Sequence, residues 1–333
     1  MLGRLHMTVD ECIEYYQRFM GTVFKHGWFK KGAHLLGKGG LYSASTLERL
    51  IKDLLREKLG REDVDLLDED VSDGKRHCKM YRAFLYTWKQ LLTLYRFVMA
   101  VRGDAANNRG PVFLRSYTNP LDPSLIPNIK LWEAARATSA APYYFEPIKV
   151  GKYELVDGGL GANNPLGWFV TTYFLWYFGL LIFIRLWTEV LGVYGASRET
   201  SCFLSIGTGI PPNVPVPGGG VAPTFGRIKG FASIATNSEI MHVLFHGLID
   251  SFAPRPVTKK YWRLNVGEKI PEWEEDSGWW FSKYKELHLD NYKDVGEMDD
   301  LDAIKLLVEM TKAYIASNVD VVEGCAATFE TKA

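Results

Sequence analysis

Cysteine is scarce in this sequence, and no two cysteines have the spacing of a metal site. The four cysteines lie far apart along the 333 residues, and none belongs to a C-x-x-C pair. This pattern argues against zinc ribbons and disulfide frameworks. The first residues also lack the pattern of a secretory signal peptide, so we expect free thiols in a reducing cytoplasm.

An excess of charge of either sign is also lacking. Lysine plus arginine and aspartate plus glutamate each number 39, so the formal net charge is zero. A balanced chain has no long-range field to draw it to nucleic acid, and we expect no nucleic-acid partner. His242 and His246 have a spacing that can bind zinc, but no third ligand accompanies them. We therefore expect no metal and no cofactor.

The residues that are present predict helices alternating with strands. Thr8 with Glu11 three positions later is typical of a helix start. Further helices are predicted at 45–59, at 131–141, where Pro142 would end the helix, and at 227–251 and 301–316. Strands are predicted at 97–101, 112–117, 153–156 and 203–206. This alternation favours an α/β fold with a mostly parallel sheet covered on both faces.

The stretch KYELVDGGLGANNPLG, residues 152–167, places an acid directly after a predicted strand. Chemistry in parallel sheets collects at the carboxyl ends of strands, and the glycines after Asp157 allow another group to approach closely. A general base is one interpretation of this acid. The alternative is that Asp157 only begins a turn or caps a helix.

Three segments in register resemble the patatin-like family of phospholipases and lipid acyl hydrolases. They are RATSAAPYYF (136–145), VDGGLGANNP (156–165) and CFLSIGTG (202–209). The likeness continues through 98–117 and YWRLNVGEK near the C-terminus, so it covers most of the chain. It implies one domain over 1–333 with a three-layer α/β/α fold, and a Ser-Asp dyad that cleaves acyl esters of lipids.

The resemblance also assigns roles to particular residues. Asp157 would accept the serine proton without a histidine between them, and Gly158 and Gly159 would shape the approach to it. The supporting residues implied by the motifs are Arg136, Ser139, Asn163, Asn164, Pro165, Gly207 and Gly209. The expected partners are phospholipid or another acyl lipid, and a membrane surface.

The nucleophile of the resembled family is missing from the sequence. Family members carry their serine in a G-x-S-x-G elbow, and neither this motif nor a GGG-x-[RK]-G loop occurs here. We expect the chain to begin shortly after its nucleophile, with a fold incomplete at the N-terminus and no catalysis by this chain alone. The rival hypothesis is a catalytically inactive lipid-binding or interaction protein.

Two stretches depart from the family pattern, at about 80–96 and at 168–187. The second has no charged residue from Trp168 to Ile184, a length at the lower limit for crossing a bilayer. A transmembrane helix is possible but disfavoured, because it would divide the sheet just after Asp157. A lid helix near the acyl site and a retained intron are the other interpretations. We expect a cytoplasmic protein, peripheral to membranes.

Overall fold

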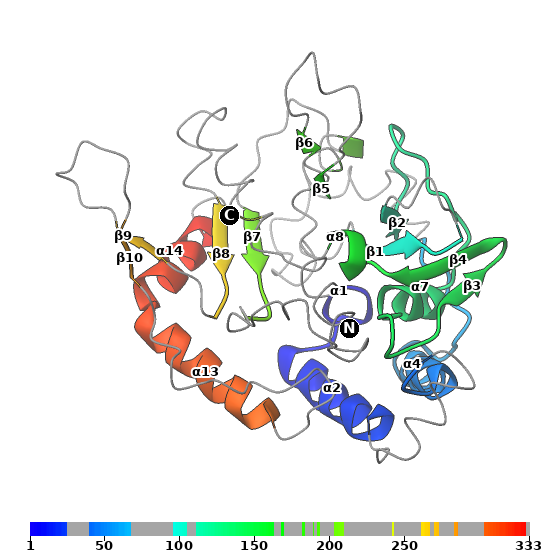
Figure 1. Cartoon of the computed structure of the whole chain (residues 1–333), viewed down its shortest axis with the longest axis horizontal. Coiled ribbons are helices and arrows are strands. Elements are labelled where there is room, and N and C mark those ends of the chain that lie inside the picture. The colour runs from blue at the N-terminus through cyan, green and yellow to red at the C-terminus, as the bar shows by residue number, and fades with distance from the viewer. Residues whose placement is uncertain are drawn as a thin grey trace, which may run out of the picture. The chain divides into compact units, whose positions relative to one another are not determined.

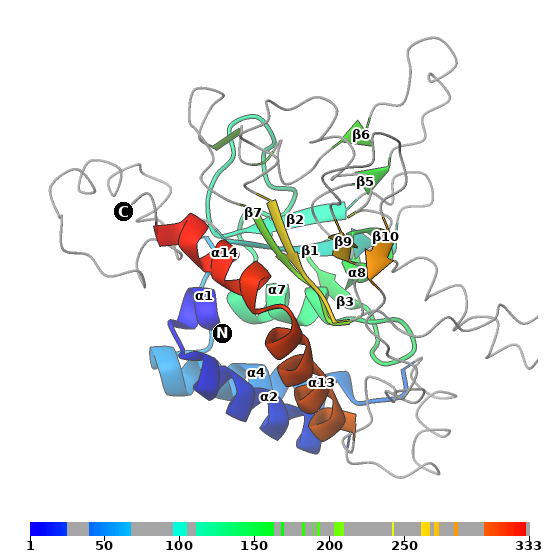
Figure 2. The ribbon, with the colours of Figure 1, turned by 90° about the vertical axis from the view of Figure 1, so that its left-hand side faces the viewer.

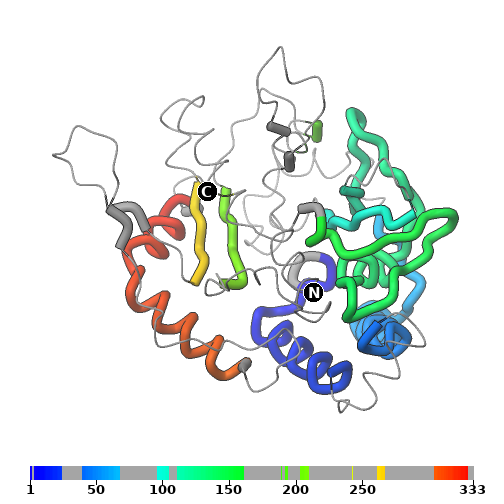
Figure 3. Tube along the Cα trace, in the orientation of Figure 1, coloured from blue at the N-terminus to red at the C-terminus, as the bar shows by residue number. Residues whose placement is uncertain are grey.

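The computed structural model describes about half of the chain in detail, and Figure 3 draws most of these residues in colour. The described residues are 1–24, 40–67, 96–104, 111–162, 168–169, 182–183, 189, 192–193, 203–209, 242, 261–266, 270–272, 283–285 and 303–330. Two compact units are present. The first comprises 1–195 with 232–237, and the second comprises 196–231 with 238–333.

Capping residues define the helices at the start of the first unit. A short helix, α1 (Leu2–Leu5), precedes α2 (Val9–Val23). Thr8 Oγ1 accepts a hydrogen bond from the Glu11 N–H at 3.2 Å, and the Thr8 N–H donates to the Glu11 carboxylate at 2.7 Å. This capping box confirms the predicted helix start. Ser43 caps α4 (Ala44–Leu59) in a similar way, through the Thr46 N–H.

Four strands of the first unit form one sheet in the order β2-β1-β4-β3, which Figure 1 shows edge-on beside α7. Their bounds are Phe97–Arg102 for β1, Pro111–Arg115 for β2, Ile148–Val150 for β3 and Tyr153–Asp157 for β4. Ala100 at the centre of β1 lies opposite Val112 on one side and Asp157 on the other. The last residue of β4 is therefore held against the middle of β1.

All three strand pairs of this sheet are antiparallel, which differs from the mostly parallel sheet that we expected. Short connections explain two of them. Only residues 151–152 join β3 to β4, with Gly151 at a φ of 57°, and only residues 103–110 join β1 to β2. A parallel pair needs a crossover of about a dozen residues or more, so these connections require antiparallel neighbours. The α/β class itself is confirmed.

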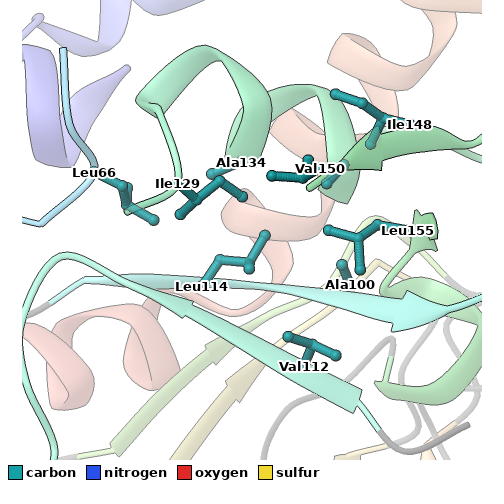
Figure 4. Packing of buried hydrophobic residues seen from close by; sticks show 10 residues of the cluster. Leu66, Ala100, Val112, Leu114, Ile129, Ala134, Ile148, Val150 and Leu155 are labelled. Atoms are coloured by element: carbon teal, nitrogen blue, oxygen red, sulfur yellow. The ribbon is translucent and has the colours of Figure 1, made fainter. Parts of the chain in front are cut away.

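Helix α7 (Leu131–Thr138) covers one face of the sheet. Figure 4 shows Leu114, Ala100 and Leu155 in the layer between the strands and Ala134 of the helix. Leu114 and Leu155 are almost completely buried, and burying one such side chain stabilises the fold by about 1.5–3 kcal/mol. The alanines of α7 permit this close approach because they project little from the helix.

Helices α4 and α2 pack on the other side of α7 (Figure 2). Phe145, from the loop before β3, joins the apolar cluster of α4 with Ile51 and Leu55. Leu54 packs against Tyr15 of α2, and Lys58 forms an ion pair with Glu11 at 2.9 Å. The first unit is thus a sheet, a covering helix and an outer helical layer.

The second unit contains a parallel strand pair. Strand β7 (Phe203–Ile206) lies in register with β8 (Tyr261–Leu264), from Phe203 opposite Tyr261 to Ile206 opposite Leu264. The remaining elements are β9 (Ile270–Glu272), β10 (Lys283–Lys285), α13 (Ala303–Ser317) and α14 (Val319–Glu330). The strand predicted at 203–206 is confirmed, and α13 agrees with the predicted helix at 301–316 to within two residues. The helices predicted at 227–251 lie outside the described residues, apart from the single position 242.

Only four residues of the apolar run at 168–187 are described. They form β5 (Trp168–Phe169) and β6 (Ile182–Phe183), which pair antiparallel. These residues do not fit an unbroken helix from Trp168 to Ile184. Among the residues that can be described, no helix has the length and hydropathy needed to cross a bilayer. The other departure, at about 80–96, lies outside the described residues except for Arg96.

Candidate active site

Asp157 is the last residue of β4, and backbone contacts fix its position. Its N–H donates to the carbonyl of Ala140 at 3.0 Å, while its Cα lies opposite Ala100 of β1. Helix α8 (Gly159–Ala162) begins two residues later and packs against β1 (Figure 1). The acid therefore projects from backbone that is held on two sides.

The carboxylate of Asp157 is half-buried and has one hydrogen bond among the described residues. Its Oδ1 accepts from the N–H of Gly159 at 2.6 Å. Burial raises the pKa of Asp157, and the hydrogen bond from Gly159 partly opposes this by stabilising the charged form. Within the described part of the chain, no lysine or arginine forms an ion pair with this group. Desolvation without a neighbouring cation gives the carboxylate a higher proton affinity.

The bond to Gly159 bears on both interpretations of Asp157. The acid does begin a helical turn, as the interpretation as a turn or cap predicts. A carboxylate has further lone pairs, so the same geometry leaves it able to accept a proton from a hydroxyl. The two roles are compatible in this position.

Gly158 allows β4 to end close against β1. A Cβ atom built on Gly158 would overlap the carbonyl of Met99, and the glycine is buried. The obstacle is backbone, which cannot rotate away as a side chain can. Only glycine fits at this point without a shift of the sheet.

Ser139 and Arg136 lie on the small-residue helix, which ends earlier than we predicted. Helix α7 stops at Thr138 rather than at residue 141, and Ser139 is its C-cap. The next residue, Ala140, is the acceptor of the Asp157 N–H. Helix α7 therefore ends where a tertiary hydrogen bond to β4 begins, and its C-cap lies three residues before Pro142.

Arg136 has structural contacts rather than contacts with Asp157. Its buried guanidinium donates through Nη2 to the carbonyl of Glu146. Its Nε lies 3.6 Å from the Glu48 carboxylate on α4. Burial lowers the pKa of Arg136, and Glu48 and Glu146 oppose the shift. Arg136 thus ties α7 to α4 and to the loop before β3.

Gly207 and Gly209 form the turn that follows β7 in the second unit. The Gly207 N–H donates to the carbonyl of Leu264 at 2.8 Å, and the Gly209 N–H donates to Asn265 Oδ1 at 2.8 Å. Gly209 has a φ of 101°, which favours glycine. A Cβ on Gly207 would overlap the Asn265 side chain. The remaining predicted residues, Asn163, Asn164 and Pro165, lie outside the described residues.

Asn265 is a residue that sequence reasoning missed. It is almost fully buried and directly follows β8, where its amide holds the turn after the neighbouring strand. The signal was present in YWRLNVGEK, since an asparagine directly after an apolar strand often binds a backbone group. Its partner is 56 residues away, which sequence spacing does not reveal.

The histidine pair considered for zinc gains no support. His242 Nδ1 forms a hydrogen bond with the Tyr261 hydroxyl at 2.9 Å, and His246 lies outside the described residues. Among the positions described, no three histidine, cysteine or acidic side chains are grouped as a metal would require.

The first unit thus combines helices with a sheet, and a partly desolvated acid, Asp157, stands at the end of β4 before two glycines. The family model for patatin-like phospholipases matches residues 2–169, which is half of the chain and ends twelve residues after Asp157. The chain belongs to the patatin-like phospholipase family.

Similar curated proteins agree with this assignment. Calcium-independent phospholipase A2-gamma of Mus musculus is 24% identical over 273 residues, covering 81% of this chain and 29% of that protein. Phospholipase A I of Arabidopsis thaliana is 32% identical over 197 residues, covering 49% of this chain and 15% of that protein. Patatin-like protein 4 of the same plant is 41% identical over 61 residues, or 16% and 15% of the two chains. The chain thus spans less than a third of the length of these relatives.

Proposed function

We propose that this chain carries the acid half of a lipid acyl hydrolase site. Asp157 would accept the proton of a serine hydroxyl as that oxygen attacks the acyl carbonyl of a phospholipid or related lipid. An acyl-serine intermediate would form with loss of the alcohol, and water would then release the fatty acid. The observation that supports this most is the half-buried, strand-end carboxylate whose pKa is raised by desolvation.

The serine of this dyad would come from a G-x-S-x-G segment outside the 333 residues, since the motif does not occur within them. We therefore propose that the chain by itself does not hydrolyse esters. Gly158 would let β4 end close against β1, and the Gly159 N–H would hold the Asp157 carboxylate in position for the serine hydroxyl. Patatin-like relatives named calcium-independent further suggest that the reaction needs no calcium.

The absence of the motif also favours a second function for the chain as it stands. A patatin-like unit without a nucleophile could still bind acyl lipid at a membrane surface, as an inactive interaction protein. Sedimentation of the 333-residue chain with phosphatidylcholine vesicles tests this second function directly.

A fluorophosphonate probe, which labels activated serines, tests the enzymatic proposal. The 333-residue chain should stay unlabelled, and a longer product that includes an upstream G-x-S-x-G segment should be labelled with or without a calcium chelator. Asp157→Asn in the longer product should slow labelling by about 10²–10⁴-fold, the usual contribution of a general base. A folded longer product that stays unlabelled contradicts the proposal. Labelling of the 333-residue chain that Asp157→Ala abolishes would show that another serine serves.

A further inference from the structure

The loop between β2 and α7 presents apolar side chains to solvent. Residues 116–129, SYTNPLDPSLIPNI, are all described, and Asp122 is the one charged residue among them. Leu121 is 77% exposed and Leu125 is 40% exposed. A single exposed leucine is ordinary on a protein surface. Two exposed leucines on one loop with so little charge make the loop a candidate interaction surface.

Hydrogen bonds and burial hold both ends of this loop in place. The buried side chain of Asn119 accepts the Leu121 N–H at 3.0 Å, and the Asn119 carbonyl accepts the Asp122 N–H at 3.3 Å. At the other end Ile129 is buried in the core, and its carbonyl accepts the Leu66 N–H at 3.0 Å. Three prolines restrict the backbone further, at 120, 123 and 127. The leucines are therefore presented without a large ordering cost on binding.

The charge of Asp122 is held at the base of the loop. Its carboxylate accepts a hydrogen bond from Arg115 Nη2 at 2.6 Å, and its carbonyl accepts one from Arg115 Nη1 at 3.1 Å. Arg115, the last residue of β2, is almost fully buried and also pairs with the buried carboxylate of Glu189. Two carboxylates share one guanidinium, so this cluster has no excess positive charge to attract an anionic surface.

The strand register places the loop at the same end of the sheet as Asp157. Asp157 ends β4 opposite Ala100, and Arg115 ends β2 opposite Phe97, three residues nearer the start of β1. Three residues of a strand span about 10 Å. The loop therefore leaves the sheet from the end that carries the acid, where an acyl lipid would meet it.

We propose that loop 116–129 enters the interface of a zwitterionic phospholipid bilayer through Leu121 and Leu125. The inference rests on the proposed function, because acyl lipids of a membrane are the substrate of that site. Two leucines supply far less contact area than the about 800 Å² per partner that a stable protein interface buries, whereas a bilayer accepts single apolar side chains. Apolar insertion of this kind needs no anionic lipid and is little affected by salt.

Sedimentation of the 333-residue chain with phosphatidylcholine vesicles tests the loop, with binding measured over a range of lipid concentrations. Leu121→Ser should weaken binding about tenfold, as expected when much of one leucine is no longer transferred from water. The double variant Leu121→Ser with Leu125→Ser should weaken it about thirtyfold or more. The matched control is Val9→Ser at the first position of α2, where the valine is 61% exposed. This control should bind vesicles like the wild type.

A gain of binding and a change of salt test the same surface in the opposite direction. Leu121→Trp should strengthen vesicle binding about threefold, because tryptophan favours the bilayer interface. Binding of the wild type should be equal at about 0.1 M and about 0.5 M salt, since apolar insertion is not screened. Replacing part of the phosphatidylcholine with phosphatidylglycerol should not strengthen it.

Three results would overturn the proposal. They are a folded 333-residue chain that does not bind phosphatidylcholine vesicles, a double variant that binds them like the wild type, and self-association without lipid that Leu121→Ser abolishes. The last result would show that the loop docks a second copy of the chain.

The vesicle experiment does not depend on the serine chemistry, so the two proposals can fail separately. If a longer product stays unlabelled by fluorophosphonate while the 333-residue chain binds vesicles through Leu121, the enzymatic proposal fails and the loop proposal is supported. If the longer product is labelled and vesicle binding does not respond to either leucine, the loop proposal fails alone.

Discussion

The turns after β4 and after β7 each contain a glycine that packs too closely against a neighbour to carry a side chain, and the neighbours differ. Each has a glycine where a side chain would collide, Gly158 with the Met99 carbonyl and Gly207 with the Asn265 amide. In the first turn the polar acceptor is the strand's own Asp157, and in the second it is Asn265 from the neighbouring strand. The first turn therefore presents a titratable group, whereas the second is closed by a neutral one.

Of the changes considered, adding a side chain at Gly158 should destabilise the protein most. Gly158→Ala forces backbone against backbone and should destabilise the first unit by about 3 kcal/mol or more. Native-state hydrogen exchange of the β1 and β4 amides measures this loss. Met99→Ala should not rescue it, because the obstacle is the carbonyl. Gly21→Ala in α2, where nothing lies within 4 Å of the added carbon, is the control and should be neutral or stabilising.

The collision at Gly207 should be smaller and can be relieved. Gly207→Ala should cost about 1–3 kcal/mol in the second unit, measured by exchange of the β7 and β8 amides. With Asn265→Ala already present, the same change should cost well under 1 kcal/mol. The two nearest atoms are then gone, and the third, at 2.9 Å, is the end of the Arg263 side chain. If Gly207→Ala and Asn265→Ala lowered the free energy of unfolding additively, the Asn265 side chain would not be what obstructs a side chain at residue 207.

Removing the side-chain amide of Asn265 alone should destabilise the second unit less than either glycine substitution. Asn265→Ala leaves the Gly209 N–H without its acceptor, a loss of about 1 kcal/mol. Asn265→Asp retains an oxygen at the same place and should keep most of the protection of the Gly209 amide from exchange. Equal loss of protection in both variants would contradict the role given to the side-chain oxygen.

The smallest expected effect is the pH dependence of stability that comes from the Asp157 carboxylate, a titratable group that the turn after β7 lacks. Because burial raises the folded-state pKa of Asp157, the folded protein binds that proton more tightly than the unfolded chain does. The stabilisation that this tighter proton binding gives the folded state is fully present below the unfolded pKa of about 3.9. It is lost as the pH rises through the higher pKa of the folded state. Asp157→Asn should remove this fall in stability, which urea unfolding at several pH values measures.

Local features of the fold could be predicted from sequence, and long-range ones could not. The capping box of Thr8 and Glu11 and the strands at 97–101 and 153–156 depend on neighbouring residues, and the structure has them close to the predicted bounds. The antiparallel sheet was missed because periodicity does not report strand direction. The short connection at 151–152 was the available signal.

The candidate site also has features that local sequence indicates and features that only the structure reveals. Asp157 became a candidate base through the local pattern of an acid between a strand and two glycines, together with the resemblance of three segments to the patatin-like family, and its catalytic role stays a prediction. The acceptor of its N–H, Ala140, and the cluster of Arg115 with Glu189 depend on contacts between distant segments. No spacing rule connects residues 74 positions apart, so these contacts required the structure.

Fatty-acid release from phosphatidylcholine vesicles by a longer product with the G-x-S-x-G segment tests the role of Asp157 most directly. Asp157→Asn preserves the shape of the side chain and an acceptor for the Gly159 N–H. We predict that this variant unfolds at the same temperature as the wild type within a few degrees and loses at least about 10²-fold in rate. A well-folded variant that releases fatty acid at the wild-type rate would contradict the account.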